Sequence, residues 1–159
     1  MNRKYLALIS RIEEELADIE ILVNKVINGW KYVKKTGDSF YLDSVALNLH
    51  GFYSALERIF LLIAQEIDES IPEGGSWHQD LLMQMKTEIK KVRPAVISRE
   101  TYQRLDEYRG FRHVVRNVYT FNLSMERIEP LVDNIENIFF QIKDELGRFT
   151  NFIEKVSEN

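Results

Sequence analysis

The sequence contains no cysteine among its 159 residues. This absence excludes disulfide bonds, thiolate zinc sites, iron–sulfur clusters and cysteine nucleophiles together, and it is consistent with a reducing compartment. Long apolar runs are also missing, because the run at residues 59–64 is far shorter than the ~20 residues that a membrane-spanning helix needs. The N-terminal segment carries three consecutive glutamates at 13–15 and has no signal-peptide core. We therefore predict a cytoplasmic protein with no membrane association.

The sequence also lacks an excess of basic residues. It has 21 Lys and Arg against 25 Asp and Glu, a formal charge of -4, which argues against a generic nucleic-acid coat protein. A chain of this length buries about two-thirds of its unfolded surface in one core. We expect residues 1–159 to form a single helical domain.

Glycine and proline are scarce, with seven and three copies, and they cluster in turns at 36–39, 70–76 and 92–94. A weaker break precedes Ser124, a predicted N-cap. Between the breaks, apolar residues recur at alternating spacings of three and four, which is typical of amphipathic helices. The stripes lie at 5–30, 42–67 and 128–156, as follows: Tyr5, Ile9, Ile12, Leu16, Ile19, Val23, Val26 and Trp30; Leu42, Ala46, Leu49, Tyr53, Leu56, Phe60, Ile63 and Ile67; Ile128, Leu131, Ile135, Ile138, Ile142, Leu146, Phe149, Ile153 and Val156.

Two further helices complete the prediction. A short one starts at Ser76, where Gln79 completes a capping-box pattern, and a long one runs from about Ser98 to Phe121. Pro130 is expected in the first turn of the last helix, where its missing N–H costs little. Strand signals are nearly absent. The predicted fold is all-α: an antiparallel four-helix bundle with an additional short helix.

One stretch of the sequence has no acidic residue, the eighteen positions between Glu107 and Glu126. It contains Arg109, Arg112 and Arg116, so it carries +3 and leaves -7 on the rest of the chain. On a helical wheel, Arg109, His113, Arg116 and Thr120 lie within roughly 60° of one another, with Arg112 and Asn117 at the flanks. The predicted helix thus has a basic face opposite an apolar one. Glu57 could meet this face as a charge partner, or it could form a surface pair with Arg58.

Such a face suits the cleavage of RNA. A neutral imidazole can remove a ribose 2′-OH proton, and guanidinium groups can stabilise the charge that develops on phosphate. We assign His113 as general base or acid and Arg116 as the transition-state stabiliser, with Arg109 and Arg112 holding phosphate. Asn117 would orient phosphate or the imidazole, and Tyr119 would stack on a base or bind phosphate.

The other candidates carry weaker signals. His78 begins the short helix after two glycines, where free N–H groups could bind an anion, so it is a secondary substrate-binding candidate. The three histidines, at 50, 78 and 113, have no metal-ligand spacing, so we expect no metal and no cofactor. A smaller basic cluster could extend an RNA path or simply be solvated: Lys86, Lys90, Lys91 and Arg93.

The string from Glu107 to Tyr119, EYRGFRHVVRNVY, resembles the signature of HEPN-domain proteins, particularly HepT-like ribonuclease toxins. Residues 53–60 and 76–82 support the resemblance, which covers roughly 38–123. It implies an all-α dimeric bundle, metal-independent RNA cleavage by an Arg/His pair, often assembled across the dimer interface, and pairing with a nucleotidyltransferase antitoxin. In this family an arginine is followed, after four to six residues, by a histidine. The motif here is a variant, because only three residues separate Arg109 from His113 and no histidine follows Arg116 before Met125. It is either a rearranged site or one without catalysis.

Two other classes of function stay open. The protein could be a non-catalytic dimeric helical interaction protein whose basic face docks an acidic partner. It could also be a plain structural bundle with a solvated basic face.

Overall fold

The computed structural model describes residues 2–117 and 123–159. Its elements are α1 (Arg3–Thr36), α2 (Ser39–Ile63), the π-helix η1 (Ala64–Asp68), α3 (Trp77–Lys86), α4 (Arg99–Asn117) and α5 (Met125–Ser157). Within the described ranges there is no strand, only an isolated antiparallel bridge between Ile89 and Arg93. The predicted all-α fold with one short helix beside four long ones is confirmed.

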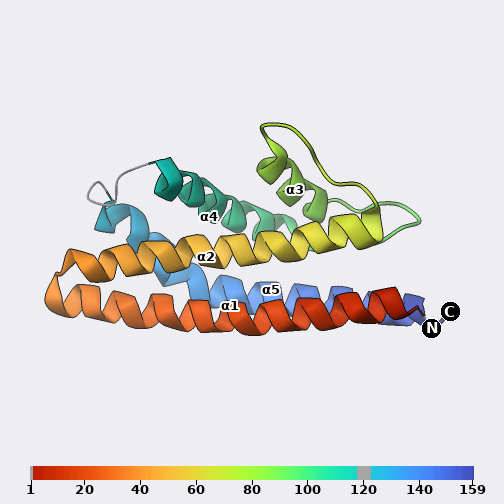
Figure 1. The fold of residues 1–159 in the computed structure, drawn as a ribbon, viewed down its shortest axis with the longest axis horizontal. Coiled ribbons are helices and arrows are strands. Elements are labelled where there is room, and N and C mark those ends of the chain that lie inside the picture. The colour runs from red at the N-terminus through yellow and green to blue at the C-terminus, as the bar shows by residue number, and fades with distance from the viewer. Residues whose placement is uncertain (1, 118–122) are drawn as a thin grey trace.

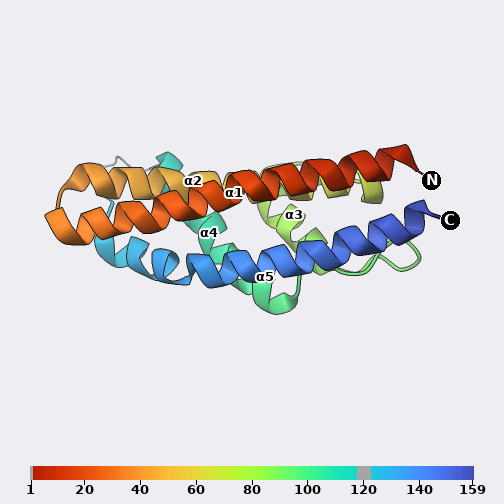
Figure 2. The same ribbon diagram turned by 90° about the horizontal axis from the view of Figure 1, so that it is seen from below.

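The long helices pack side by side in an antiparallel arrangement (Figures 1 and 2). α1 packs against α2 and α5, while α4 packs against α2 and α5 and α3 packs on α2 and α4. The two termini lie at the same end of the molecule, so α5 runs back along α1 (Figure 2). In the part of the chain that is described, no helix combines the length and the apolar composition that crossing a bilayer requires.

A tight connection between α1 and α2 makes them a hairpin. Gly37 ends α1 in the left-handed conformation, with φ of 67°, which glycine adopts without strain. The next residue, Asp38, caps α2 by accepting a hydrogen bond from the N–H of Phe40 at 2.9 Å. The predicted turn at 36–39 is therefore correct, and only Gly37 and Asp38 lie between the end of α1 and the start of α2.

The predicted apolar stripes form the core. In α2, every stripe position from Leu42 to Ile63 is buried, and in α5 the same holds from Ile128 to Ile153. The stripe of α1 is less deeply buried at Tyr5, Ile9 and Leu16, which pack against the core from its edge. Val156, at the end of the last stripe, is exposed. The core contains residues from all five α-helices.

Three local predictions were wrong. The Ser76 side chain makes no capping hydrogen bond, so the capping box with Gln79 does not form. Pro130 lies inside α5 and not in its first turn, because the helix already begins at Met125 after the Ser124 cap. The second helical segment extends to Asp68, as the stripe to Ile67 predicted, but its last five residues, Ala64–Asp68, form a π-helix. Arg93 is buried, so it cannot extend a surface RNA path.

Arg93 instead belongs to a buried ion pair between two loops. Its Nε and Nη2 donate to the two carboxylate oxygens of Asp68 at 2.6 and 2.7 Å, and both side chains have no exposed surface. Three backbone carbonyls, of Gln84, Thr87 and Pro94, accept its remaining hydrogen bonds. A bidentate pair with all donors satisfied tolerates burial. It fastens the end of η1 to the loop after α3 and thereby holds α3 in place.

Candidate functional site

The orientation of α4 decides which of its residues face outward. Tyr108 is buried, donates its hydroxyl to the carbonyl of Leu131 in α5 at 2.6 Å, and packs edge-on against Phe52 in α2. Burial raises the pKa of Tyr108 well above its ordinary value, with a further contribution from Glu107, so the hydroxyl stays protonated as a donor. Because Phe111 and Leu105 are buried on the same side, the basic side of α4 faces away from the core.

The start of α4 is held by an acid from α5. Glu145 accepts hydrogen bonds from the N–H of Ser98 at 2.5 Å and from the hydroxyl of Thr101 at 2.6 Å. The Ser98 hydroxyl in turn accepts from the N–H of Thr101 at 3.1 Å. A carboxylate at a helix N-terminus is favourable because it faces the positive end of the helix dipole. The start and the middle of α4 are therefore both anchored to α5.

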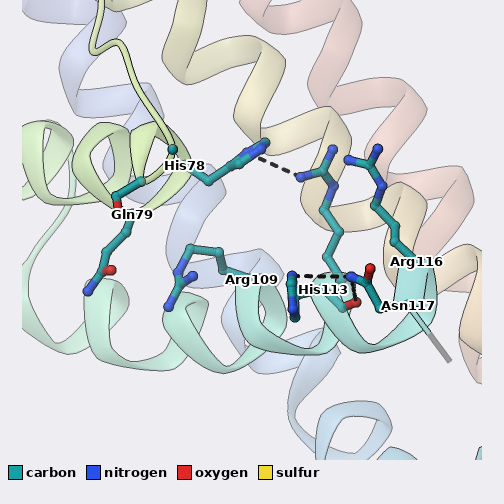
Figure 3. Close-up of a pocket in the computed structure, with 9 residues that line it drawn as sticks. His78, Gln79, Arg109, His113, Arg116 and Asn117 are labelled. Carbon is teal, nitrogen blue, oxygen red and sulfur yellow. Dashed lines mark hydrogen bonds between the residues drawn. The ribbon is translucent and has the colours of Figure 1, made fainter.

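The outward side of α4 and the start of α3 enclose a pocket of about 340 Å³ (Figure 3). It is lined by Gly75, Ser76, His78, Gln79, Arg109, Arg112, His113, Arg116 and Asn117. Six of the seven predicted site residues thus lie around one cavity, although His78 and His113 come from different helices. The seventh, Tyr119, lies outside the described residues.

Two of the pocket arginines have acidic partners, contrary to the expectation of an uncompensated patch. Arg109 Nε lies 2.7 Å from Asp106, one turn earlier on α4. Arg112 Nη1 lies 3.6 Å from Glu57 of α2, as one of the two alternatives for Glu57 predicted. The sequence between Glu107 and Glu126 contains no acidic residue, but the fold brings Asp106 and Glu57 close to two of its arginines. Arg116 is exposed and has no ion-pair partner among residues 2–117 and 123–159.

Glu57 is the centre of a polar cluster that joins three helices. Its side chain is 5% exposed, and its Oε2 lies 2.7 Å from Nδ1 of His78 in α3. Arg112 of α4 donates through Nε to the hydroxyl of Ser54 at 3.0 Å, and its Nη1 lies 3.2 Å from the same Nδ1. Figure 3 shows His78 reaching from α3 towards the side chains of α4. This cluster places a histidine of α3 and an arginine of α4 at one wall of the pocket.

His113 is exposed, and Asn117, one turn later on the same helix, contacts its ring and its backbone carbonyl. The amide of Asn117 donates to the His113 carbonyl at 2.7 Å, which identifies the nitrogen end of that amide. The same nitrogen lies 3.3 Å from His113 Nδ1, so Nδ1 faces a donor. The neutral imidazole therefore carries its hydrogen on Nε2.

A comparison with protein-family models matches residues 44–153, from α2 into α5, to the HepT-like protein family. This match includes more than half of the chain and every residue that lines the pocket. The chain belongs to the HepT-like family. No curated protein and no solved structure matches this HepT-like chain.

The third histidine of this HepT-like protein, His50, does not line the pocket but is close enough to be influenced by two of its arginines, which the sequence analysis did not predict. Burial, and then the charges of Arg112 and Arg116, lower the pKa of His50, while Glu57 opposes them. The signal for it was present in the sequence, because His50, Ser54 and Glu57 follow the i, i+4, i+7 spacing of one helix face. That face of α2 contacts the basic side of α4.

In the described part of the HepT-like chain, no group of three or more His, Asp or Glu residues gathers as a metal site would require. The side-chain groups that line the pocket are imidazole, guanidinium, amide and one hydroxyl. These can transfer protons and stabilise anionic charge.

Proposed function

We propose that this HepT-like protein is a metal-independent endoribonuclease and acts as the toxin of a toxin–antitoxin pair. The observation that carries the proposal is one pocket that holds His113 beside Arg116, a cation with no ion-pair partner in the described chain. A phosphodiester entering this pocket supplies the missing anion. His113 then transfers a proton, as base or acid, and the arginines stabilise the charge on phosphorus oxygens.

Each residue has a defined role in this proposal. Arg116 stabilises the transition state because it is free to pair with phosphate. Arg109 and Arg112 bind the neighbouring phosphate oxygens with the donors that Asp106 and Glu57 leave unused. Asn117 orients His113, and Tyr119 contacts an adjacent base or phosphate. The product is a 2′,3′-cyclic phosphate, and the reaction requires no cofactor.

The decisive experiment is cleavage of single-stranded RNA in EDTA. Wild-type protein should cleave, and His113→Ala should lose about 10²- to 10⁴-fold in rate, the usual contribution of general acid–base catalysis. Arg116→Ala should lose a comparable factor, about 10²- to 10³-fold. Arg104→Ala is the matched control, because Arg104 lies on the same helix, outside the pocket lining, and forms an exposed ion pair with Glu100. Wild-type protein that leaves RNA intact contradicts the nuclease proposal.

The partner follows from the family resemblance. We expect a nucleotidyltransferase, encoded beside this protein, to act as the antitoxin and to suppress its growth inhibition on co-expression. We also expect a homodimer, as the resemblance implies, and the exposed His113 and Arg116 of the pocket could then face the partner copy. Light scattering at several concentrations measures the oligomeric state, and a concentration-independent monomer contradicts the dimer.

A non-catalytic interaction protein is the second candidate. It is favoured by the ion pairs of Arg109 and Arg112, because these arginines already meet carboxylates and an acidic partner could extend that pattern. In that case complex formation is abolished in a triple variant that carries Arg109→Ala, His113→Ala and Arg116→Ala, and the wild-type protein has no activity on RNA. A structural bundle predicts that the triple variant changes neither property.

A further inference from the structure

Two histidines line the same pocket, and the groups around them prefer different tautomers. His78 comes from α3 and His113 from α4. Cleavage of a phosphodiester by its own 2′-hydroxyl needs two proton transfers, one from O2′ and one to O5′. The inference below rests on the proposed nuclease function and assigns these two transfers.

The surroundings of His78 make its Nδ1 a donor. An ionised carboxylate only accepts hydrogen bonds, and Glu57 lies 2.7 Å from this nitrogen. Nη1 of Arg112, a donor, competes for the same nitrogen at 3.2 Å, but this contact is longer than that of the carboxylate. The shorter, charge-assisted contact therefore places the hydrogen on Nδ1. Nε2 is left with its lone pair, and no described residue bonds to it.

The surroundings of His113 produce the opposite arrangement. The amide nitrogen of Asn117 faces Nδ1 at 3.3 Å, so the ring hydrogen is on Nε2. One histidine thus offers the pocket an acceptor, and the other offers a donor. Figure 3 shows His113 on α4 and His78 reaching across from α3.

We propose that His78 is the general base and His113 the general acid of the cleavage reaction, with Glu57 as the positioning residue of His78. Nε2 of His78 takes the proton of the 2′-hydroxyl as the O2′–P bond forms. The P–O5′ bond breaks, and the imidazolium form of His113 gives its Nε2 proton to O5′. This form also carries a hydrogen on Nδ1, so the amide of Asn117 turns away from that nitrogen when His113 takes up its second proton. The products are a 2′,3′-cyclic phosphate and a 5′-hydroxyl, so atoms and charges balance without an added reactant. Glu57 stabilises the imidazolium that forms on His78.

Two substrates distinguish the base from the acid. In RNA the leaving alkoxide needs a proton, whereas in a ribonucleoside 3′-(4-nitrophenyl phosphate) the stable phenolate leaves without one. His113→Ala should lose about 10²- to 10⁴-fold on RNA and less than about tenfold on the aryl ester. His78→Ala should lose about 10²- to 10⁴-fold on both substrates. Met83→Ala, which shortens an exposed side chain on the same helix as His78, is the control for α3.

The role of Glu57 has a spectroscopic test that does not depend on activity. Nitrogen-15 spectra of the side chains should show His78 as the Nδ1–H tautomer and His113 as the Nε2–H tautomer in the wild-type protein. Glu57→Gln should shift His78 towards the Nε2–H form and lower kcat with little change in KM. Circular dichroism verifies that the variant is folded. An Nε2–H tautomer of His78 in the wild-type protein overturns the assignment.

The outcomes separate this inference from the function beneath it. If wild-type protein cleaves neither substrate, the nuclease proposal fails and takes this inference with it. If wild-type protein cleaves both and His78→Ala does so equally well, only the assignment of His78 is overturned. If the aryl ester rescues His78→Ala but not His113→Ala, the two roles are reversed and the proposal is wrong.

Discussion

The carboxylate of Glu57 lies 2.7 Å from Nδ1 of His78, although 21 positions separate the two residues in the chain. This contact joins α2 to α3, and Arg112 adds α4 to the same cluster. Glu57 is almost fully buried, so its charge depends on these two partners for compensation. The site and the packing of three helices therefore share one acidic side chain.

Glu57→Ala should lower the free energy of unfolding by about 1–3 kcal/mol, because it leaves the polar groups of Arg112 and His78 without their acceptor. The destabilisation should be greatest near the cluster, so the variant should increase the rate of amide hydrogen exchange more in α3 than in α5. Urea unfolding and hydrogen exchange measure the two effects. Asp144→Ala, which removes an exposed pair with Arg148, is the control. Equal effects of the two variants would contradict a structural role of the cluster.

The buried pair of Arg93 and Asp68 should have a larger effect on stability. Arg93→Ala should lower the free energy of unfolding by about 3–5 kcal/mol, because it leaves a fully buried carboxylate uncompensated. Replacing both residues by apolar ones of similar volume should cost less than the single change, since no buried charge is then left alone.

The control for the buried pair is Arg148→Ala, whose exposed partner lies four residues earlier on the same helix. That variant should change stability by less than about 0.5 kcal/mol. Urea unfolding at neutral pH compares the three proteins. A double variant that is less stable than Arg93→Ala would show that the pair itself, and not the isolated charge, provides the stability.

His50 should make stability depend on pH. Its pKa is lowered in the folded protein by burial and by Arg112 and Arg116, so the unfolded chain binds the proton more tightly. The contribution of His50 is therefore fully present above its ordinary pKa of 6.5 and is lost as the pH falls through the lower folded pKa. Thermal unfolding between pH 5 and 8 should show this decline, and His50→Gln should reduce it.

A second variant tests the cause of the His50 shift. Arg116→Ala removes one of the two charges that lower this pKa, and the pKa should then rise towards its ordinary value. A proton NMR titration of the imidazole gives the pKa directly. An unchanged value in Arg116→Ala would mean that burial and Arg112 produce the shift without Arg116.

The sequence predicted those features that depend on neighbouring turns of one helix. The burial of Leu49 and Ile142 followed from a spacing of three and four. The common face of Arg109, His113 and Arg116 followed from the same geometry. These relations need no knowledge of how helices pack.

Most contacts between residues of different helices or loops could not be predicted from the sequence. Arg93 stands among lysines in the chain, and only the path of the loops brings it to Asp68. Glu57 was open to two interpretations, because helical periodicity specifies a face but not the neighbour that covers it. The tautomers of His78 and His113 depend on contacts shorter than 3.5 Å and so require coordinates.

Glycine substitutions provide a last prediction, on the packing of the functional helix. A methyl group at Gly110 in α4, or at Gly147 in α5, would meet nothing within 4 Å outside its own stretch of helix. Alanine at either position should raise the free energy of unfolding by about 0.5–1 kcal/mol, because glycine loses more backbone entropy on folding. At Gly29 the methyl group would lie 3.0 Å from the Val45 side chain, where α1 meets α2. Gly29→Ala should therefore gain less than the other two, since overpacking offsets the entropy term. Urea unfolding of the three variants makes the comparison, and a gain at Gly29 equal to that at Gly110 would show that the α1–α2 contact readily adjusts.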